Sequence, residues 1–111
     1  MQSLDDKLQA LCDAYALQLP AKIKAIDALW ERIAASGDRD AVQALHRELH
    51  SLAGSGETFG YAQLGRSARA LELTVEALCG GVTLPRGALE PLAPLLDQLR
   101  HAAAMPDSPA S

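Results

Sequence analysis

The feature of this sequence that most constrains its fold is the dominance of alanine and leucine. Of its 111 residues, 21 are alanine and 19 are leucine, whereas valine, isoleucine and threonine together supply only nine. Alanine and leucine are strong helix formers, and β-sheets draw mainly on β-branched and aromatic residues. The composition therefore predicts an all-α fold and argues against a β-sandwich, a β-barrel or a parallel sheet.

The size and charge of the chain narrow the functional classes. A length of 111 residues suits one domain, which can bury a core without a metal or a disulfide. The net charge of −4 and the shortage of aromatic residues argue against nucleic-acid binding, which needs a basic surface. The longest uncharged segment, 77–85, is shorter than the roughly 18–20 apolar residues of a membrane span. Asp5 and Asp6 stand where a secretory signal would be basic, so we expect a cytoplasmic protein.

Helical periodicity divides the chain into five apolar blocks. Apolar residues recur at spacings of three and four in residues 4–19, 23–33, 42–59, 61–78 and 89–99. Pro20 separates the first two blocks, and we expect a short N-terminal helix to end there because proline is disfavoured inside helices. Short connections between later blocks make their helices antiparallel neighbours. The sequence thus predicts an antiparallel, up-and-down four-helix bundle with a short additional N-terminal helix.

The ends of the expected helices are marked by residues that stop or cap helices. These are Ser36, Gly37 and Asp38 after the second block, Gly60 after the third, and Gly80 with Gly81 after the fourth. The last helix is expected to start near Pro91, after a looser turn from Pro85. Residues 105–111 contain two prolines and two serines, which predicts a disordered tail. Residues 1–104 then form the bundle.

Nucleotide-binding motifs are absent from the sequence. Gly54, Gly56 and Gly60 have the spacing GxGxxxG, whereas a dinucleotide-binding loop has GxGxxG directly after a strand. No strand is expected before these glycines. The chain is therefore not expected to be a kinase or another nucleotide-dependent enzyme.

The cysteines and histidines do not predict a metal site. Cys12 and Cys79 lie far apart without CxxC spacing, and we interpret them as reduced, buried thiols. His46, Glu48 and His50 form HxExH, which differs from the zinc motif HExxH. Glu48 points about 200° away from His46 around a helix, so it faces away from a metal held by the two histidines. We expect no bound metal.

His50 lies on the solvent side of the third expected helix. The apolar stripe of that helix consists of Val42, Leu45, Leu49, Leu52, Gly56 and Phe59. His50 points about 130° from the centre of this stripe, and Gly54 follows one turn later. Glycine inside a helix costs about 1 kcal/mol relative to alanine. Gly56, in the stripe, lets a neighbouring helix approach, whereas Gly54 buries nothing and is best explained as clearing space beside His50.

An exposed imidazole can act as a nucleophile. Near neutral pH a histidine of ordinary pKa is largely uncharged, so one ring nitrogen is free to attack a phosphoryl group. The alternative is that His50 is an ordinary solvent-exposed histidine. The glycine one turn away favours the nucleophile.

The segment around His50 resembles the signature of histidine-containing phosphotransfer (HPt) domains. The matching residues are His50, Leu52 and Gly54, then Phe59 and Gly60, then Leu64 and the pair Leu71 and Glu72. The resemblance covers nearly the whole chain. It implies a helical bundle whose histidine accepts a phosphoryl group from a receiver-domain aspartate and passes it to another receiver. On this basis His50 is the phosphorylation site, Gly54 is the clearance beside it, and Gly60 lies in the turn between helices.

One position departs from the signature. HPt domains usually have HxLKG, and here Ala53 replaces the lysine, which normally supplies positive charge near the phosphate or the docked receiver. Ala53 is therefore assigned to the docking and clearance region with Gly54. Arg47, Arg66 and Arg69 are the basic residues that we expect to contact the phosphate or the receiver instead.

The leading hypothesis is a phosphorelay carrier that is not itself an enzyme. The resemblance implies response-regulator receivers or a hybrid sensor histidine kinase as partners, with no cofactor except Mg²⁺ in the receiver. The alternative is a non-phosphorylated module of the same fold that binds or sequesters a response regulator. A metal enzyme built on His46 and His50 is the third hypothesis. We expect a monomer, and Met1 directly before the first helix favours a free-standing protein.

Overall fold

The computed structural model describes residues 3–78 and 87–107, and all secondary structure in these ranges is helical. The elements are α1 (Leu4–Ser36), α2 (Arg39–Thr58), α3 (Ala62–Leu78), the 3₁₀-helix η1 (Glu90–Leu92) and α4 (Ala93–Ala103). The all-α prediction is confirmed for the described residues. The start and end of α2 and the start of α3 lie where the sequence predicted, and η1 with α4 together correspond to the helix expected near Pro91.

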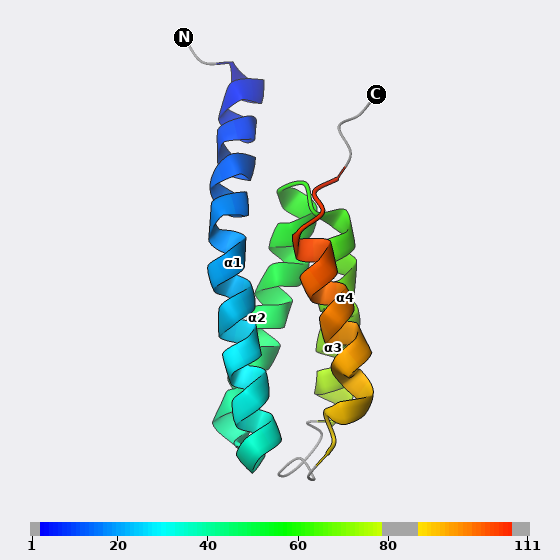
Figure 1. Cartoon of the computed structure of the whole chain (residues 1–111). Helices are drawn as coiled ribbons and strands as arrows, with labels where there is room; N and C mark the ends of the chain where they lie inside the picture. The colour runs from blue at the N-terminus through cyan, green and yellow to red at the C-terminus, as the bar shows by residue number, and fades with distance from the viewer. Residues whose placement is uncertain (1–2, 79–86, 108–111) are drawn as a thin grey trace.

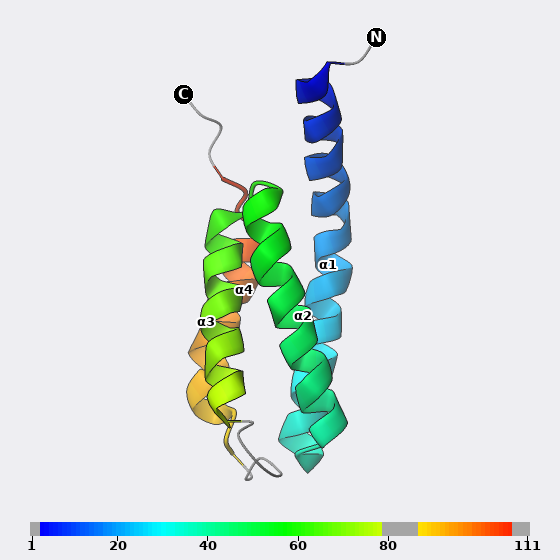
Figure 2. The same ribbon diagram turned by 180° about the vertical axis from the view of Figure 1, so that it is seen from behind.

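The four α-helices lie side by side along the long axis of a molecule that measures 54 × 24 × 20 Å (Figure 1). Consecutive helices run in opposite directions, and α2 lies between α1 and α3 when the molecule is seen from behind (Figure 2). α4 packs against α3 and also contacts α1. The N-terminal turns of α1 extend beyond the other helices in both views. No helix in the described ranges combines the length and apolar character that crossing a membrane requires.

The helix break expected at Pro20 is wrong, because α1 continues through this residue as one helix of 33 residues. A separate short N-terminal helix is therefore not present. Proline fits a helical φ but removes one hydrogen bond and crowds the preceding turn. The Pro20 ring is exposed, whereas Leu19 before it and Ile26 after it are buried. Packing of both flanking segments keeps the helix continuous, and the lost bond lies on the solvent side, where a carbonyl can turn to water.

The turn between α1 and α2 follows the expected stop and cap. Gly37 has φ +65°, and its N–H donates to the carbonyl of Ile33 at 2.7 Å. The Asp38 carboxylate accepts from the N–H groups of Asp40 and Ala41, which caps α2. Arg32 donates to the same carboxylate at 2.7 Å. This hydrogen bond is the main cause that lowers the pKa of Asp38 below its ordinary value.

Two glycines set the distance between α2 and α3. A Cβ atom at Gly56 would lie 2.9 Å from the backbone nitrogen of Gly65, and a Cβ atom at Gly65 would lie 3.0 Å from the carbonyl oxygen of Ala53. The helix backbones therefore meet where neither residue has a side chain. The close approach expected at Gly56 is confirmed, and Gly65 is its partner on α3. This crossing fixes which residues of α3 lie opposite the middle of α2.

The segment after α4 is tied to the turn between α2 and α3. Gly60 has φ +89°, a left-handed conformation that suits glycine. The N–H of Asp107 donates to the Gly60 carbonyl at 2.7 Å, and its carboxylate accepts from the N–H of Ala62 at 2.9 Å. Asp107, near the C-terminus, thus caps the start of α3. This contact differs from the expectation of a disordered tail from residue 105. Residues 108–111 lie outside the described residues.

Several sequence expectations fall on residues 79–86, which also lie outside the described residues. They concern Cys79, the helix stop at Gly80 and Gly81, and the turn from Pro85. Cys12 is a free thiol that is partly rather than fully buried.

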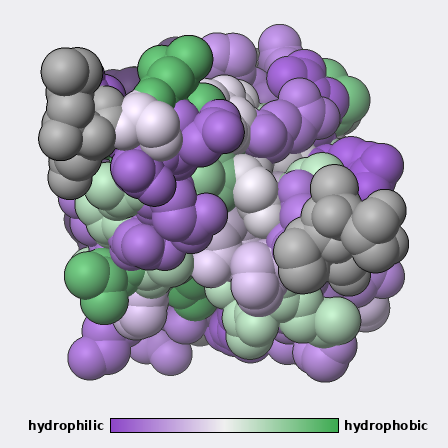
Figure 3. All heavy atoms as spheres, turned by 90° about the horizontal axis from the view of Figure 1, so that it is seen from above, coloured by the Kyte–Doolittle hydropathy of each residue, from purple (hydrophilic) through white to green (hydrophobic). Residues whose placement is uncertain are grey.

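The core is formed by the apolar stripes of all four helices. Its least exposed large side chains are Ile26, Leu45, Leu49, Leu64, Leu71, Val75 and Leu99. At one end of the core the Tyr15 ring stacks on Phe59 with centroids 5.0 Å apart, and its hydroxyl is 2.8 Å from Ser55 Oγ. Burial raises the pKa of Tyr15 above its ordinary value. Seen from above, this end is largely hydrophilic with separate hydrophobic areas (Figure 3).

Candidate functional site

His50 projects into solvent from the middle of α2. Its side chain is 71% exposed, while the neighbouring Leu49 and Leu52 are almost fully buried. The helical period explains this contrast, because His50 is about 100° around the helix from Leu49. Burial of the apolar stripe therefore fixes the imidazole on an open face, as the sequence predicted.

One carboxylate from α3 reaches the ring of His50. Oε2 of Glu72 lies 2.6 Å from Nδ1 of His50, which is a short, strong hydrogen bond. The Glu72 side chain is only 8% exposed, and Glu72 is the buried charged residue among those described. It lies beside Leu71 on α3, and the close crossing at Gly56 and Gly65 brings it level with His50.

The contact with Glu72 selects one tautomer of His50. An ionised carboxylate only accepts hydrogen bonds, so the proton must be on Nδ1 of the neutral imidazole. The lone pair is then on Nε2, the other ring nitrogen. Because 71% of the side chain is exposed, an incoming electrophile can reach this nitrogen. The arrangement resembles a nucleophile oriented by a fixed acceptor, which is the general requirement for nucleophilic catalysis by histidine.

A second histidine lies one turn before His50, at the same carboxylate. Nε2 of His46 is 3.7 Å from Oε2 of Glu72 and 3.8 Å from Oε2 of Glu76. The His46 side chain is 34% exposed, but its Nε2 atom is buried. In the described part of the chain neither this atom nor Oε1 of Glu72 has a hydrogen-bond partner. No group of three or more residues among residues 3–78 and 87–107 has an arrangement that could hold a metal ion.

The space beside His50 is open at Gly54. A Cβ atom built on Gly54 meets no other group within 4 Å, in contrast to Gly56 and Gly65. The backbone of Gly54 is helical and exposed, so its lack of a side chain serves neither a turn nor a helix contact. Its carbonyl also accepts a hydrogen bond from Thr58 Oγ1 at 3.1 Å. The space at Gly54, one turn after His50, is therefore open, and its role in receiver docking stays a prediction.

Ala53 lies in the interface between α2 and α3. It is 1% exposed, and its carbonyl oxygen is one of the atoms that a Cβ at Gly65 would meet. The residue thus belongs to the packed contact between the helices, and it contributes little surface to a docking face. A lysine at this position would have to pass its aliphatic stem out along the interface to bring its ammonium group to solvent.

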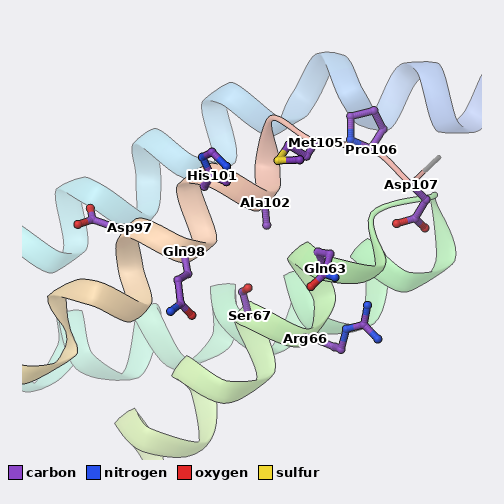
Figure 4. A pocket seen from close by; sticks show the side chains of 10 residues that line it. All are labelled: Gln63, Arg66, Ser67, Asp97, Gln98, His101, Ala102, Met105, Pro106 and Asp107. Atoms are coloured by element: carbon purple, nitrogen blue, oxygen red, sulfur yellow. The ribbon is translucent and has the colours of Figure 1, made fainter.

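The structure separates the three arginines that were expected to lie near the phosphate. Arg47 is exposed one turn before His50, and Arg69 is exposed one turn before Glu72. Arg66 lies elsewhere, because it lines a groove of about 830 Å³ between α3 and α4 (Figure 4). The salt bridges of the described residues include none of these arginines. Arg47 and Arg69 are therefore the two that share helix faces with the site.

The role of Glu72 as the partner of His50 was not predicted, although the residue belongs to the signature that the sequence resembles. The available signal was its position. Glu72 follows Leu71 and stands one turn after Ala68 and one turn before Val75, all of which are buried. A carboxylate at such a position must find a hydrogen-bond donor, because an unpaired buried charge is very costly. His46 gave no comparable signal, since histidines are common at half-buried positions.

Comparison of the chain with known protein families gives a match over most of its length. The family described as the Hpt domain matches residues 1–104 of the chain. No curated protein and no solved structure gives a significant match. The match therefore spans all four α-helices and includes the histidine, its carboxylate partner and the open glycine.

Proposed function

Since the chain belongs to the HPt family, we propose that it is a phosphorelay carrier that holds the phosphoryl group on Nε2 of His50. HPt domains are phosphocarriers of two-component signalling rather than enzymes, and they interact with receiver domains. In this chain, His50 takes the phosphoryl group from the aspartate of one receiver and delivers it to the aspartate of another.

The observation that carries this proposal is the pairing of an exposed imidazole with a buried carboxylate. A solvent-exposed histidine without a role would not need an acceptor fixed 2.6 Å from Nδ1. Burial of the Glu72 carboxylate destabilises the fold through desolvation. A phosphorylated His50 needs this carboxylate to orient its ring, whereas a module that only binds a regulator does not. The geometry therefore favours the carrier.

Phosphoryl transfer at His50 follows from this arrangement. The lone pair of Nε2 forms a bond to phosphorus while the bond between phosphorus and the aspartate oxygen breaks, and that electron pair stays on the aspartate carboxylate. Positive charge then develops on the imidazole and is shared by Nδ1–H. The carboxylate of Glu72 stabilises this charge across the short hydrogen bond. Transfer to a second receiver is the reverse of these steps.

The receiver supplies the remaining chemistry. Its aspartate carries the phosphoryl group, and its Mg²⁺ neutralises the charge on the transferring oxygens. The chain supplies the nucleophile and the open surface at Gly54, where a receiver can approach without meeting a side chain. Arg47 and Arg69 are the exposed cations that we assign to the phosphate or to the receiver surface.

The direct test is to incubate the chain with a phosphorylated receiver and to follow transfer of the label. The wild-type chain is expected to gain an acid-labile phosphate, and His50→Gln is expected to gain none while its helical circular dichroism is unchanged, because the exposed side chain adds little to packing. A wild-type chain that binds the receiver but takes no phosphate would instead support the binding-only module.

A further inference from the structure

His46 has a buried polar atom, Nε2, that the transfer steps above do not use. Its Nε2 atom has no hydrogen-bond partner, and Oε1 of Glu72 has none either, within the described residues. Both atoms are shielded from water. A buried donor or acceptor without a partner destabilises the folded protein, because its hydrogen bond to water is lost and not replaced. The two orphaned atoms belong to side chains that are already neighbours, since His46 Nε2 is 3.7 Å from Oε2 of Glu72.

A small movement would give Nε2 of His46 a hydrogen-bond partner. The terminal torsion of a glutamate is broad, so its carboxylate can rotate at little cost. A closure of roughly 0.5 Å would bring His46 Nε2 within the usual 2.7–3.2 Å of Oε2 of Glu72, the oxygen that also contacts Nδ1 of His50. One carboxylate oxygen can accept both hydrogen bonds, because it has two lone pairs. Glu76 is a weaker partner, because its side chain is 63% exposed and water competes for its oxygens.

We propose that His46 is a positioning residue for phosphoryl transfer, donating a hydrogen bond from Nε2–H to Glu72 and thereby holding that carboxylate against Nδ1 of His50. The inference rests on the proposed function, because it assigns a role within the same reaction. Glu72 then bridges two imidazoles on successive turns of α2. His46 touches neither the phosphate nor the receiver, and it acts through the carboxylate.

This role explains why the carboxylate stays in one place. Glu72 reaches His50 from α3 along a flexible side chain, and a single hydrogen bond leaves its terminal torsion free to turn. A second hydrogen bond from His46 holds Oε2 in place against Nδ1 of His50. His50 then keeps its proton on Nδ1 and its lone pair on Nε2, which is the tautomer that transfer needs.

Two substitutions of His46 test the proposal, one by a residue without a hydrogen-bond donor and one by a residue that has a donor. His46→Leu keeps a similar volume without a donor, and His46→Gln offers an amide N–H to Glu72. Nitrogen NMR of the histidine rings at mildly alkaline pH reports the tautomer of His50 directly. We expect His46→Leu to lower the population of the Nδ1–H tautomer and to slow transfer by about tenfold, as for a lost buried hydrogen bond. His46→Gln should keep both within about twofold of wild type, because its amide retains the donor.

The control is His101→Leu, which removes an exposed histidine from α4 and should change neither the tautomer of His50 nor the rate. Circular dichroism checks that each variant is folded, and His46→Ala replaces His46→Leu if the latter does not fold. An unchanged His50 tautomer in the folded donor-free variant would overturn the proposal. So would an equal loss in His46→Gln and His46→Leu. The tautomer is measured without a receiver, so it decides this inference even if the wild-type chain takes up no phosphate.

Discussion

Nδ1 of His50 on α2 and Oε2 of Glu72 on α3 lie 2.6 Å apart, although the histidine side chain is 71% exposed and the glutamate side chain only 8%. The two helices thus place an imidazole in solvent and its carboxylate partner in the protein interior. The close crossing at Gly56 and Gly65 is what makes this geometry possible, because it sets the register between the helices.

Removing the charge of Glu72 should slow transfer while the bundle stays folded. Glu72→Gln keeps an oxygen that can accept from His50 Nδ1–H, but it loses the negative charge that stabilises the developing imidazolium. Charge-assisted hydrogen bonds are roughly twice as strong as neutral ones, so we expect a loss of about tenfold in transfer rate. Rapid-quench transfer from a phosphorylated receiver measures the rate. A rate equal to that of wild type would show that the carboxylate does not take part.

Replacing the exposed Gly54 and the buried Gly56 of α2 with alanine should change the stability of the protein in opposite directions. Gly54→Ala meets open space and should hold or raise the free energy of unfolding, by up to about 1 kcal/mol, whereas Gly56→Ala forces the helices apart and should lower it by about 1–3 kcal/mol. Urea denaturation measures the free energy of unfolding of both variants.

Gly54→Leu should slow transfer, because its side chain obstructs the approach of the receiver. If this variant bound the receiver and transferred phosphate as the wild type does, Gly54 would not serve as clearance beside His50.

The arginines provide a matched pair on one helix. Arg69 shares a face of α3 with Glu72, whereas Arg66 lines the groove toward α4. We expect Arg69→Ala to weaken receiver binding or to shorten the lifetime of the phosphohistidine by about two- to fivefold at low salt, as for an exposed ion pair, and Arg66→Ala to have no effect. Arg47→Ala should behave like Arg69→Ala. Equal effects at Arg66 and Arg69 would mean that net charge alone matters.

The stability that Asp38 contributes should be lost below about pH 4. The pKa of its carboxyl is lowered mainly by the hydrogen bond from Arg32, so the contact adds stability that is complete above the unfolded pKa of about 3.9 and is lost as the pH falls through the lower folded pKa. Asp38→Asn keeps an oxygen for the helix cap but removes the charge. Its melting temperature should be below that of wild type at neutral pH, and the two should converge at about pH 2. A constant difference across this range would contradict the assignment.

Periodicity in the sequence was sufficient to predict α2, α3 and the exposed position of His50. The apolar stripe of α2 contains Leu45, Leu49 and Leu52, all almost fully buried, and burial of this stripe leaves His50 in solvent. The helix stop at Gly37 and the close approach at Gly56 were also predicted, because glycine at these positions has a specific backbone role. Such features are local, and local features can be read from residue spacing.

The features that the sequence did not predict depend on packing between distant segments. Pro20 suggested a helix break, but burial on both sides of it keeps α1 continuous. The short turn between α2 and α3 indicates the level of Arg66 along the bundle, but it does not indicate which side of α3 the residue occupies. Asp107 caps α3 across 45 residues of sequence, which no local rule anticipates.

Phosphate is expected on Nε2 of His50 because Glu72 occupies Nδ1. Phosphorus and nitrogen NMR of the chain after incubation with a phosphorylated receiver distinguishes the two ring nitrogens and the three histidines. We predict one phosphohistidine signal, which is bonded to Nε2 of His50 and is absent from His50→Gln. A phosphate on Nδ1 of His50 or on His46, or a signal that survives in His50→Gln, would show that Nε2 of His50 is not the atom that carries the phosphoryl group.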